Sequence, residues 1–584
     1  MPMKSRNLVA AIVMTTVPLG MIHAQEAADG FAPEIATGVS PRTLQTAQKF
    51  MVAAANPHAA TAGHDALARG GNAIDAMVAT QLILGLVEPQ SSGLGGGAFM
   101  VYYDAAGDQL TTFDGRETAP MAATPTLFQD DNGEKLKFWD AVVGGLSVGT
   151  PGTVKLIYET HKTHGKLDWS SLVQPAIDLA ESGFEVSTRL NKLISNDQER
   201  LSVHPDTKAY FFGQDGNPHA VGHILKNQAY ADTLKKIASG GADAFYKGPI
   251  AQAIVDRVQN AGNPGVLALA DLSNYDIKER DPVCVTYREH DVCGMGPPSS
   301  GALTVGQILG LLQPYPLAEL GPTSVDSWRL IGDASRLAFA DRGRYMADSD
   351  FVPMPTDGLV SARYLTERSA LLSGDTALES VSAGEPEWDH AMLMADDESI
   401  EFKSTSHFSI VDAQGNVVSM TTTIENGFGS RLMSGGFLLN NELTDFSFAT
   451  HNNGVPIANR VEPGKRPRSS MSPTVVMKEG KPYMVIGSPG GSRIIGYVAK
   501  TIIAHIDWGM NVQEAINMPH AVNRFGTYDL EEGTGAMALQ NELEEVGYKV
   551  NVRSLNSGLH AIVIADDMLM GGADPRREGV ALGE

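Results

Sequence analysis

A β-hairpin signal in the last third of the chain constrains the fold more than any other feature. Residues 405–412 and 417–423 are both rich in β-branched and aromatic side chains, and the turn residues 413–416 separate them. A polar, acid-rich stretch, residues 396–404, precedes the first run and has no apolar period. The sequence therefore predicts a loop that leads abruptly into a strand whose first residue is a threonine.

Thr405, that first residue, is the candidate nucleophile. Cleavage of the peptide bond between Ser404 and Thr405 would give Thr405 a free α-amine beside its own hydroxyl. An α-amine has a pKa of about 7.7–8, so a usable fraction is neutral near pH 7 and can act as a base. On the hairpin alone, an ordinary strand threonine is the more frequent explanation, because threonine is common in strands. The choice between the two depends on residues elsewhere.

Motifs on both sides of the hairpin supply that evidence. Downstream stand residues 440–446 (NNELTDF), 465–474 (KRPRSSMSPT) and 487–493 (GSPGGSR). Upstream stand residues 69–75, 87–97, 114–120 (DGRETAP) and 297–301, and residues 574–576 (DPR) lie near the C-terminus. Together with the hairpin, these motifs resemble the γ-glutamyltranspeptidases, a family of the N-terminal-nucleophile hydrolase superfamily. The resemblance spans nearly the whole chain after its leader.

The resemblance implies a fold and a maturation step. The fold is of the α+β class: an αββα four-layer sandwich, one globule built from two autoprocessed fragments. Autocatalytic cleavage before Thr405 would give a large subunit, residues 25–404, and a small subunit, residues 405–584, paired as a heterodimer. The expected reaction moves a γ-glutamyl group from glutathione or another γ-glutamyl compound to water, an amino acid or a peptide, through an ester on Thr405. No cofactor is implied.

The same resemblance assigns the catalytic groups. Thr405 supplies the nucleophile and, through its amine, the base. Thr423 stands near the end of the second strand and would hold Thr405 in position. Gly490 and Gly491 would present backbone N–H groups to the oxyanion, each worth about 3–4 kcal/mol in comparable sites.

The substrate's amino-acid head needs both donors and acceptors. The guanidinium of Arg116 suits an α-carboxylate because it forms a bidentate fork, and the hydroxyls of Ser469 and Ser470 add donors. The α-amine needs acceptors, for which the candidates are Glu425, Glu442 and Asp445. Many relatives in the family carry asparagine at the position of Glu425, so the role of this extra carboxylate stays open.

Two other functions compete with γ-glutamyl transfer. A related acylase would remove glutaryl groups from cephalosporins, but glutaryl lacks the α-amine and would leave the carboxylates of the pocket unpaired, which is costly. A non-catalytic module could bind glutathione without turning it over, although the presence of Thr405, Thr423 and the two glycines argues against it.

The pattern Gly-x-Ser-x-Gly at residues 145–149 matches a serine-hydrolase elbow, but Thr150-Pro151-Gly152 follows where a helix should begin.

The first residues read as a secretory leader. Lys4 and Arg6 precede an apolar stretch, residues 8–21, and Ala24 ends a cleavage site, so residues 1–24 are expected to be a signal peptide. The stretch is too short for a membrane anchor, and no later segment qualifies. We therefore expect a periplasmic or secreted protein with no membrane partner. Its net charge of −24 makes it a poor binder of nucleic acid.

Several local features give weaker expectations. Export makes a disulfide between Cys284 and Cys293 possible, and two cysteines without suitable histidine spacing do not make a metal site. Apolar spacing predicts helices over residues 44–55, 64–85, 324–341 and 494–506. The loop between Phe446 and Lys465 looks short beside family members with a lid, so we expect an open or partly lidded cleft.

Overall fold

The structure is a computed structural model that describes residues 38–584 except 391, 398, 400, 402–403 and 566–567. The expected signal peptide, residues 1–24, lies outside the described residues.

Two seven-stranded sheets form the centre of the described part of the chain. The first has the order β23 (Val580–Gly583), β2 (Met51–Ala54), β10 (Thr405–Val411), β11 (Val417–Thr423), β3 (Gly97–Asp104), β4 (Gln109–Gly115) and β7 (Lys278–Arg280). The second has the order β1 (Gln45–Ala47), β22 (Met568–Ala573), β21 (His560–Ala565), β17 (Lys481–Gly487), β16 (Thr474–Lys478), β9 (His290–Gly294) and β8 (Val283–Tyr287).

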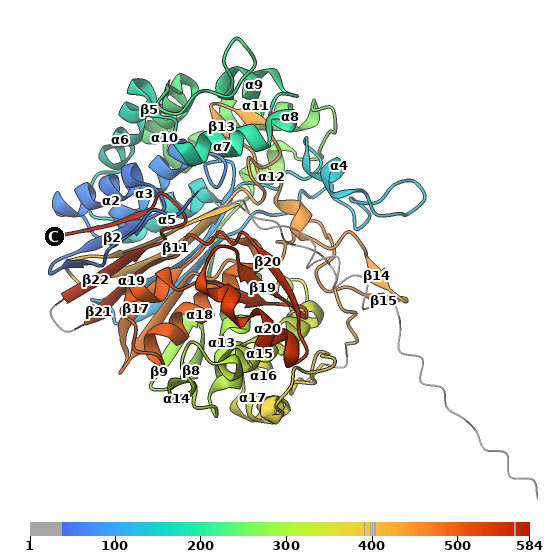
Figure 1. The fold of residues 1–584 in the computed structure, drawn as a ribbon. Coiled ribbons are helices and arrows are strands. Elements are labelled where there is room, and N and C mark those ends of the chain that lie inside the picture. Colours follow the sequence, from blue (N-terminus) through green and yellow to red (C-terminus); the bar gives the residue numbers. More distant parts are fainter. Residues whose placement is uncertain (1–37, 391, 398, 400, 402–403, 566–567) are drawn as a thin grey trace, which may run out of the picture.

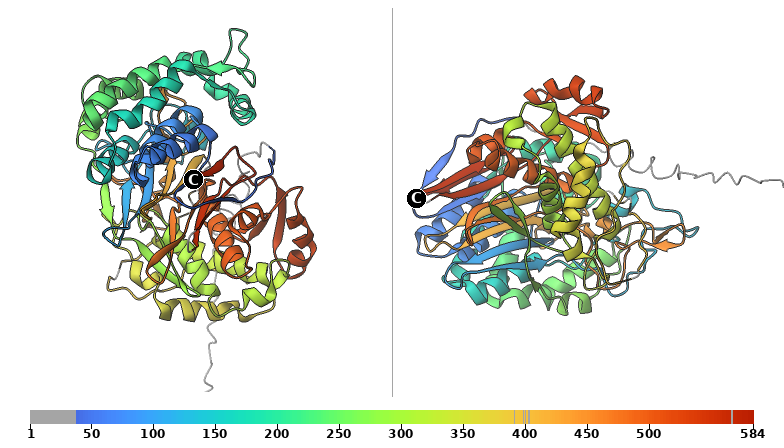
Figure 2. Two further views of the ribbon diagram at one scale, coloured as in Figure 1. Left: turned by 90° about the vertical axis from the view of Figure 1, so that its left-hand side faces the viewer. Right: turned by 90° about the horizontal axis from the view of Figure 1, so that it is seen from below.

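The two sheets stack face to face over a shared apolar layer. Val411 and Val417 of the first sheet pack with Val475, Val485 and Ile562 of the second. Every residue of β10 and of β11 is buried, polar side chains included, because both faces of these strands are covered. Helices cover the outer faces of both sheets (Figures 1 and 2). The expected αββα sandwich is confirmed.

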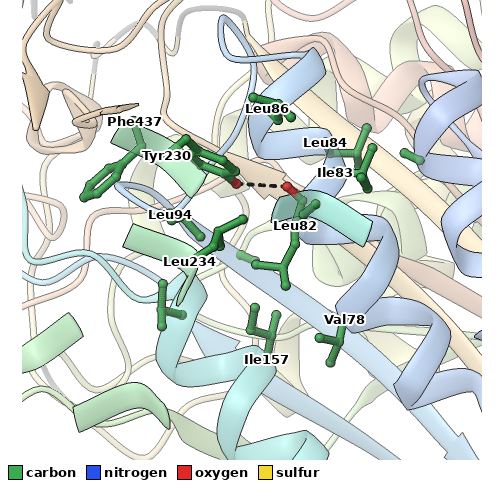
Figure 3. Close-up of a cluster of buried hydrophobic side chains, with 14 of the residues drawn as sticks. Val78, Leu82, Ile83, Leu84, Leu86, Leu94, Ile157, Tyr230, Leu234 and Phe437 are labelled. Carbon is green, nitrogen blue, oxygen red and sulfur yellow. Dashed lines mark hydrogen bonds between the residues drawn. The ribbon is translucent and has the colours of Figure 1, made fainter. Parts of the chain in front are cut away.

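One helical layer lies against the first sheet. It contains α2 (Pro57–Ala68), α3 (Ala73–Val87), α5 (Thr153–His164), α6 (Trp169–Ser182) and α10 (Gln228–Tyr246). Every residue of α3 is buried, because the helix lies between the sheet and the outer helices α6 and α10. Figure 3 shows Leu82 of α3 near Leu234 of α10, and the Tyr230 hydroxyl donates to the Leu82 carbonyl at 2.9 Å.

The opposite layer lies against the second sheet. It contains α13 (Gly301–Leu312), α15 (Val325–Tyr345), α18 (Ile494–Ile506) and α19 (Val512–Asn517). In the left view of Figure 2 these yellow-green and orange helices lie below the strands, and the blue and teal helices lie above them.

Both sheets contain strands from before and from after Thr405, hydrogen-bonded to one another. In the first sheet, β10 lies between β2 and β11, and β11 lies between β10 and β3. In the second, β16 pairs with β9 and β22 pairs with β1. The segments on either side of Thr405 therefore share one core, and neither could keep its sheets without the other.

Some of the local secondary-structure predictions are confirmed and others are wrong. The helix over residues 494–506 is confirmed with the same bounds, and α15 confirms the helix over 324–341. The helix over residues 44–55 is wrong, since this segment forms β1 and β2, and a short apolar run fits a buried strand as well as a helix. The expected helix over 64–85 is two helices, divided where Asn72 caps α3.

Cys284 and Cys293 form a disulfide across the β8–β9 pair. No described helix is long and apolar enough to cross a membrane.

Candidate active site around Thr405

Thr405 and Thr423 face each other across the predicted hairpin. The antiparallel register of β10 and β11 pairs the first residue of one strand with the last residue of the other. The Thr423 hydroxyl donates to the carbonyl oxygen of Ser404 at 2.9 Å and accepts from the backbone N–H of Glu425 at 2.8 Å. A donor on that carbonyl polarises the bond between Ser404 and Thr405, which is the bond expected to break.

Residues 88–91 hold the chain on both sides of this bond. The Ser404 hydroxyl donates to the Gln90 carbonyl at 2.6 Å, and the Ser406 hydroxyl donates to the Glu88 carboxylate at 2.7 Å. The backbone N–H of Ile424 donates to the Ser91 carbonyl at 3.3 Å. The motif that contains these residues can be recognised in the sequence. Its contact with the bond between Ser404 and Thr405 depends on the tertiary structure.

A small cavity lies beside Thr405, and it brings together all of the predicted site residues except Gly490. Its volume is about 20 Å³. Its lining consists of Arg116, Glu401, Thr405, Thr423, Glu425, Glu442, Asp445, Ser469, Ser470, Met471, Gly491 and Ile494. A space of this size holds about one water molecule and no γ-glutamyl group. Glu401 also lines this cavity in the uncut chain, and the open or partly lidded cleft stays a prediction for the mature enzyme.

Arg116 is buried, and each nitrogen of its guanidinium has a hydrogen-bond or ion-pair partner. Its guanidinium pairs with the carboxylates of Glu442 and Asp445, the latter at 2.6 Å. It also donates to the backbone carbonyls of Pro467 at 3.2 Å and Arg468 at 2.9 Å. Burial acts to lower the pKa of Arg116, but Glu442 and Asp445 raise it above its usual value. Arg116 thus stays positively charged and fixes the positions of Glu442 and Asp445, which form the acidic wall of the cavity.

The acidic wall has an acceptor to spare. Asp445 Oδ1 is buried and accepts no hydrogen bond from the described residues, and Glu442 Oε2 is buried with no nitrogen donor, its carboxyl facing that of Glu117. Burial raises the pKa of Glu442 and of Asp445 well above the usual range, against the opposing effect of Arg116. Burial likewise raises the pKa of Glu117, behind Glu442, to about 8. Three carboxyl groups here share one cation, Arg116, so a cationic ligand would add the further positive charge that this side of the site can accept.

Glu425 and the serine pair have structural partners of their own. Glu425 lies in the left-handed region with φ of 75°, a conformation that costs energy for a non-glycine residue and clusters at functional sites. Its carboxylate accepts from the side-chain amide of Asn441. The Ser469 hydroxyl accepts from the N–H of Met471 at 3.1 Å, and the Ser470 hydroxyl accepts from Arg342 at 2.8 Å.

Gly490 and Gly491 form the turn between β17 and α18. Their φ angles are 139° and 59°, which favour glycine, and a Cβ at Gly490 would meet the Tyr497 ring at 2.8 Å. Gly491 lines the cavity and Gly490 lies next to it in the chain. Backbone N–H groups at such a turn can approach a developing oxyanion closely.

Three residues that were not predicted line the cavity, and one pattern that was considered in the sequence lies outside it. Glu401, Met471 and Ile494 line the cavity but were not singled out in the sequence, because nothing in its local pattern marks them. Ser147, the centre of the serine-hydrolase pattern, is buried and donates to the Val142 carbonyl at 3.1 Å, away from the cavity.

Comparison with known proteins gives three informative matches. Residues 59–584 match the family model described as Gamma-glutamyltranspeptidase. The glutathione hydrolase proenzyme of Bacillus subtilis (strain 168) is 39% identical over 546 residues, covering 91% of this chain and 91% of the relative. The Acylase ACY 1 proenzyme of Pseudomonas sp. (strain V22) is 34% identical over 550 residues, covering 93% and 94%. The crystal structure of a cephalosporin acylase from Bacillus halodurans aligns with a TM-score of 0.82 at 26% identity, covering 95% of this chain and 99% of that one.

Proposed function

We propose a function from one premise: the chain belongs to the γ-glutamyltranspeptidase family. It is an enzyme that transfers the γ-glutamyl group of glutathione, or of another γ-glutamyl compound, to water or to the amino group of an amino acid or peptide. The reaction proceeds through an ester on Thr405.

Self-cleavage comes first, and the geometry around Ser404 supports it. The Thr405 hydroxyl attacks the Ser404 carbonyl carbon, the C–N bond breaks, and the nitrogen keeps the proton that leaves the hydroxyl. Water then hydrolyses the resulting ester, which leaves a carboxylate on Ser404 and a free amine on Thr405. The hydrogen bond from Thr423 to the Ser404 oxygen stabilises the negative charge that develops there.

In turnover, the freed amine of Thr405 takes the proton of the Thr405 hydroxyl as the oxygen attacks the γ-carbonyl of the substrate. The same proton passes to the leaving amine, and water or an acceptor amine repeats the step on the ester. The N–H groups of Gly490 and Gly491 are proposed to bind the oxyanion. No step needs a cofactor or a metal.

Asp445 Oδ1, which accepts no hydrogen bond from the described residues, and the neighbouring carboxyl of Glu442 carry the substrate choice. An α-ammonium group can donate to both and add the further positive charge that this wall can accept. A glutaryl group would place a methylene there and leave the Asp445 acceptor unpaired, at a cost of roughly 1–3 kcal/mol. The matches to acylases favour the glutaryl alternative as the second candidate.

Two measurements test this function. Turnover of γ-glutamyl-p-nitroanilide should exceed turnover of glutaryl-p-nitroanilide in kcat/KM, and the reverse order would promote the acylase function. Thr405→Ala should remain a single chain by mass spectrometry, whereas Ser406→Ala, which removes the neighbouring hydroxyl, should still be cut. Normal cleavage of Thr405→Ala would remove Thr405 as the nucleophile.

We also propose that residues 25–404 and 405–584 stay together as a heterodimer after cleavage, since strands of both segments pair with each other in both sheets. Export to the periplasm or the medium is supported by the leader pattern of residues 1–24 and by the disulfide, which persists in oxidising compartments.

A further inference from the structure

The first three residues of β10 have a strand partner on one side only among the described strands. β11 pairs with β10 from Thr405 to Val411, whereas the ladder with β2 begins at Phe408. The carbonyl oxygen of Thr405 accepts a hydrogen bond from a side chain, Nη1 of Arg577, at 3.2 Å. Arg577 is buried and lies in the segment between β22 and β23. A guanidinium thus holds the backbone of the candidate nucleophile.

A second buried charged group holds the next residue. The Ser406 hydroxyl donates to the carboxylate of Glu88, which ends α3 and pairs with Arg189 at 3.5 Å. Burial raises the pKa of Glu88, and the charges of Arg189 and Arg577 act against that rise. The start of β10 is therefore fixed by side chains at the point where its pairing with β2 has not yet begun.

Arg577 also contacts the segment that packs on the turn proposed to bind the oxyanion. Its Nε donates to the Ser557 carbonyl at 2.9 Å. A Cβ on the next residue, Gly558, would meet Pro489 at 2.6 Å and the Cδ of Arg577 at 2.8 Å, so Gly558 lies packed between them. Pro489 directly precedes Gly490 in the chain. One arginine therefore links the nucleophile to the oxyanion turn.

Cleavage before Thr405 would change what holds this residue. Thr405 would become a chain terminus, and termini are poorly ordered unless they are tied down. A displacement of about 1 Å at a reacting group can cost about 10²-fold in rate. The contact between Arg577 and the Thr405 carbonyl lies within residues 405–584, so it does not depend on the bond that would break.

We propose that Arg577 is a positioning residue of the mature enzyme: its guanidinium holds the carbonyl of Thr405 after cleavage and keeps the free amine and the hydroxyl of Thr405 directed at the substrate carbon. This inference rests on the proposed function. Arg577 is not among the residues that line the cavity, so it acts through Thr405 and not on the substrate. Its loss should slow the chemistry without weakening substrate binding.

The first test separates chemistry from binding in the mature enzyme. Arg577→Met keeps an unbranched apolar side chain but donates no hydrogen bond. It should lower kcat for γ-glutamyl-p-nitroanilide by about tenfold to a hundredfold, whereas the inhibition constant of glutamate, the product of hydrolysis, should change by less than about twofold. Arg577→Lys, which keeps the charge and a donor, should recover part of the loss. An unchanged kcat, or an equal loss in glutamate binding, would overturn the proposal.

The pH profile of kcat/KM gives a second readout, because its acid limb reports the base of the free enzyme. Arg577 places a cation on the residue that carries the proposed base, and a nearby cation disfavours an ammonium group. Arg577→Met should therefore move the acid limb to higher pH by about one unit, and Arg577→Lys should leave it near its wild-type position. A purely structural loss would lower the rate at every pH and leave the limb in place, which would contradict the proposal.

The other ionisable groups around Thr405 stay the same in these variants. His560 interacts electrostatically with Arg577, but burial lowers its pKa to about 4, below the limb expected for an α-amine. The remaining groups lie behind Ser406 or line the cavity: Glu88, Arg116, Glu401, Glu425, Glu442 and Asp445.

Arg329 offers a matched control. It is a buried arginine of α15 that donates to a backbone carbonyl, that of Leu372, at 3.1 Å, and it is not among the residues that line the cavity. Arg329→Met should keep the wild-type kcat, glutamate inhibition and acid limb, even if it lowers the melting temperature. A loss of kcat as large as that of Arg577→Met would mean that any buried arginine has this effect, and would overturn the proposal.

Because Arg577→Met could fail to mature, another experiment uses the uncut chain. In Thr405→Ala, adding Arg577→Met should speed amide hydrogen exchange at the start of β10 and leave exchange in α18 unchanged. No change at the start of β10 would overturn the proposal. Exchange that rises equally in α18 would show that Arg577 supports the whole fold, and would also overturn it.

The two proposals fail differently. A wild-type enzyme that does not turn over γ-glutamyl-p-nitroanilide contradicts the proposed function. Normal wild-type turnover, with an unchanged kcat and an unmoved acid limb in Arg577→Met, contradicts the positioning role alone.

Discussion

The Thr423 hydroxyl lies 2.9 Å from the carbonyl oxygen of Ser404 and donates a hydrogen bond to it. The contact follows from register: Thr405 and Thr423 are opposite each other, so the end of β11 meets the residue that precedes β10. In the uncut chain this places a donor on the carbonyl that we propose is attacked, and after the proposed cleavage it would leave a hydroxyl beside Thr405.

Thr423→Val, which keeps the shape but loses the hydroxyl, should slow self-cleavage by about 10²–10³-fold, the usual effect of losing one oxyanion donor. The measurement is the fraction of uncut chain with time on a denaturing gel. Thr423→Ser should restore cleavage. Thr422→Val is the control, since that hydroxyl donates to the Gly97 carbonyl instead. Unchanged cleavage in Thr423→Val would leave the Ser404 carbonyl without an assigned donor.

Arg116→Lys should raise KM for γ-glutamyl-p-nitroanilide by about tenfold or more, because one ammonium cannot replace a fork that serves two carboxylates and two carbonyls. Glu442 and Asp445 then lose their fixed positions. Mass spectrometry should still show a cut chain, since the arginine does not contact Ser404. Arg466→Lys, a buried arginine outside the cavity, is the matched control. A normal KM would mean that Arg116 only supports the fold.

Asp445→Asn should impair γ-glutamyl turnover more than glutaryl turnover. The γ-glutamyl substrate loses a charge-assisted bond to its ammonium, worth roughly 1.5–3 kcal/mol, whereas the glutaryl substrate has no ammonium to lose. Glu442 offers a second acceptor, so we expect the low end of that range. The comparison is kcat/KM for the two p-nitroanilides in wild type and variant. Equal losses on both would place Asp445 in the support of Arg116 rather than in amine binding.

Acid should destabilise the protein through His560. Its ring is buried, and burial lowers its pKa to about 4. Between pH of about 4 and about 6.5 the unfolded chain binds the proton and the folded chain does not. Stability therefore falls as the pH falls through this window, by roughly 3 kcal/mol for the full shift.

The readout is the urea midpoint at pH 7 and at pH 4.5 for wild type and for His560→Gln. The variant should lose less stability on acidification, even if it is less stable at pH 7. His390→Gln, whose side chain is 54% exposed, should keep the wild-type difference between the two pH values. An identical difference in His560→Gln would mean that other groups carry the acid sensitivity.

Sequence reasoning succeeded where the signal is local or carried by a motif. The hairpin, the helix over 494–506 and the family resemblance depend on residues adjacent in the chain. It failed at residues 44–55, because a short apolar run that becomes β1 and β2 has no period that separates a buried strand from a helix. It also failed for Glu401, whose acidic surroundings suggest a solvated loop until Arg342 is placed against it.

The sequence by itself determined the nucleophile candidate, the family and nearly all of the residues that meet at the cavity, because these are properties of side-chain type and order. Only the tertiary structure decided how their charges pair. Arg116 and Asp445 lie 329 residues apart, and Arg342 and Glu401 lie 59 apart, and each pair meets because strands and helices from both segments pack into shared layers. Electrostatic pairing depends on distance and burial in space, and neither is written in the local pattern of the chain.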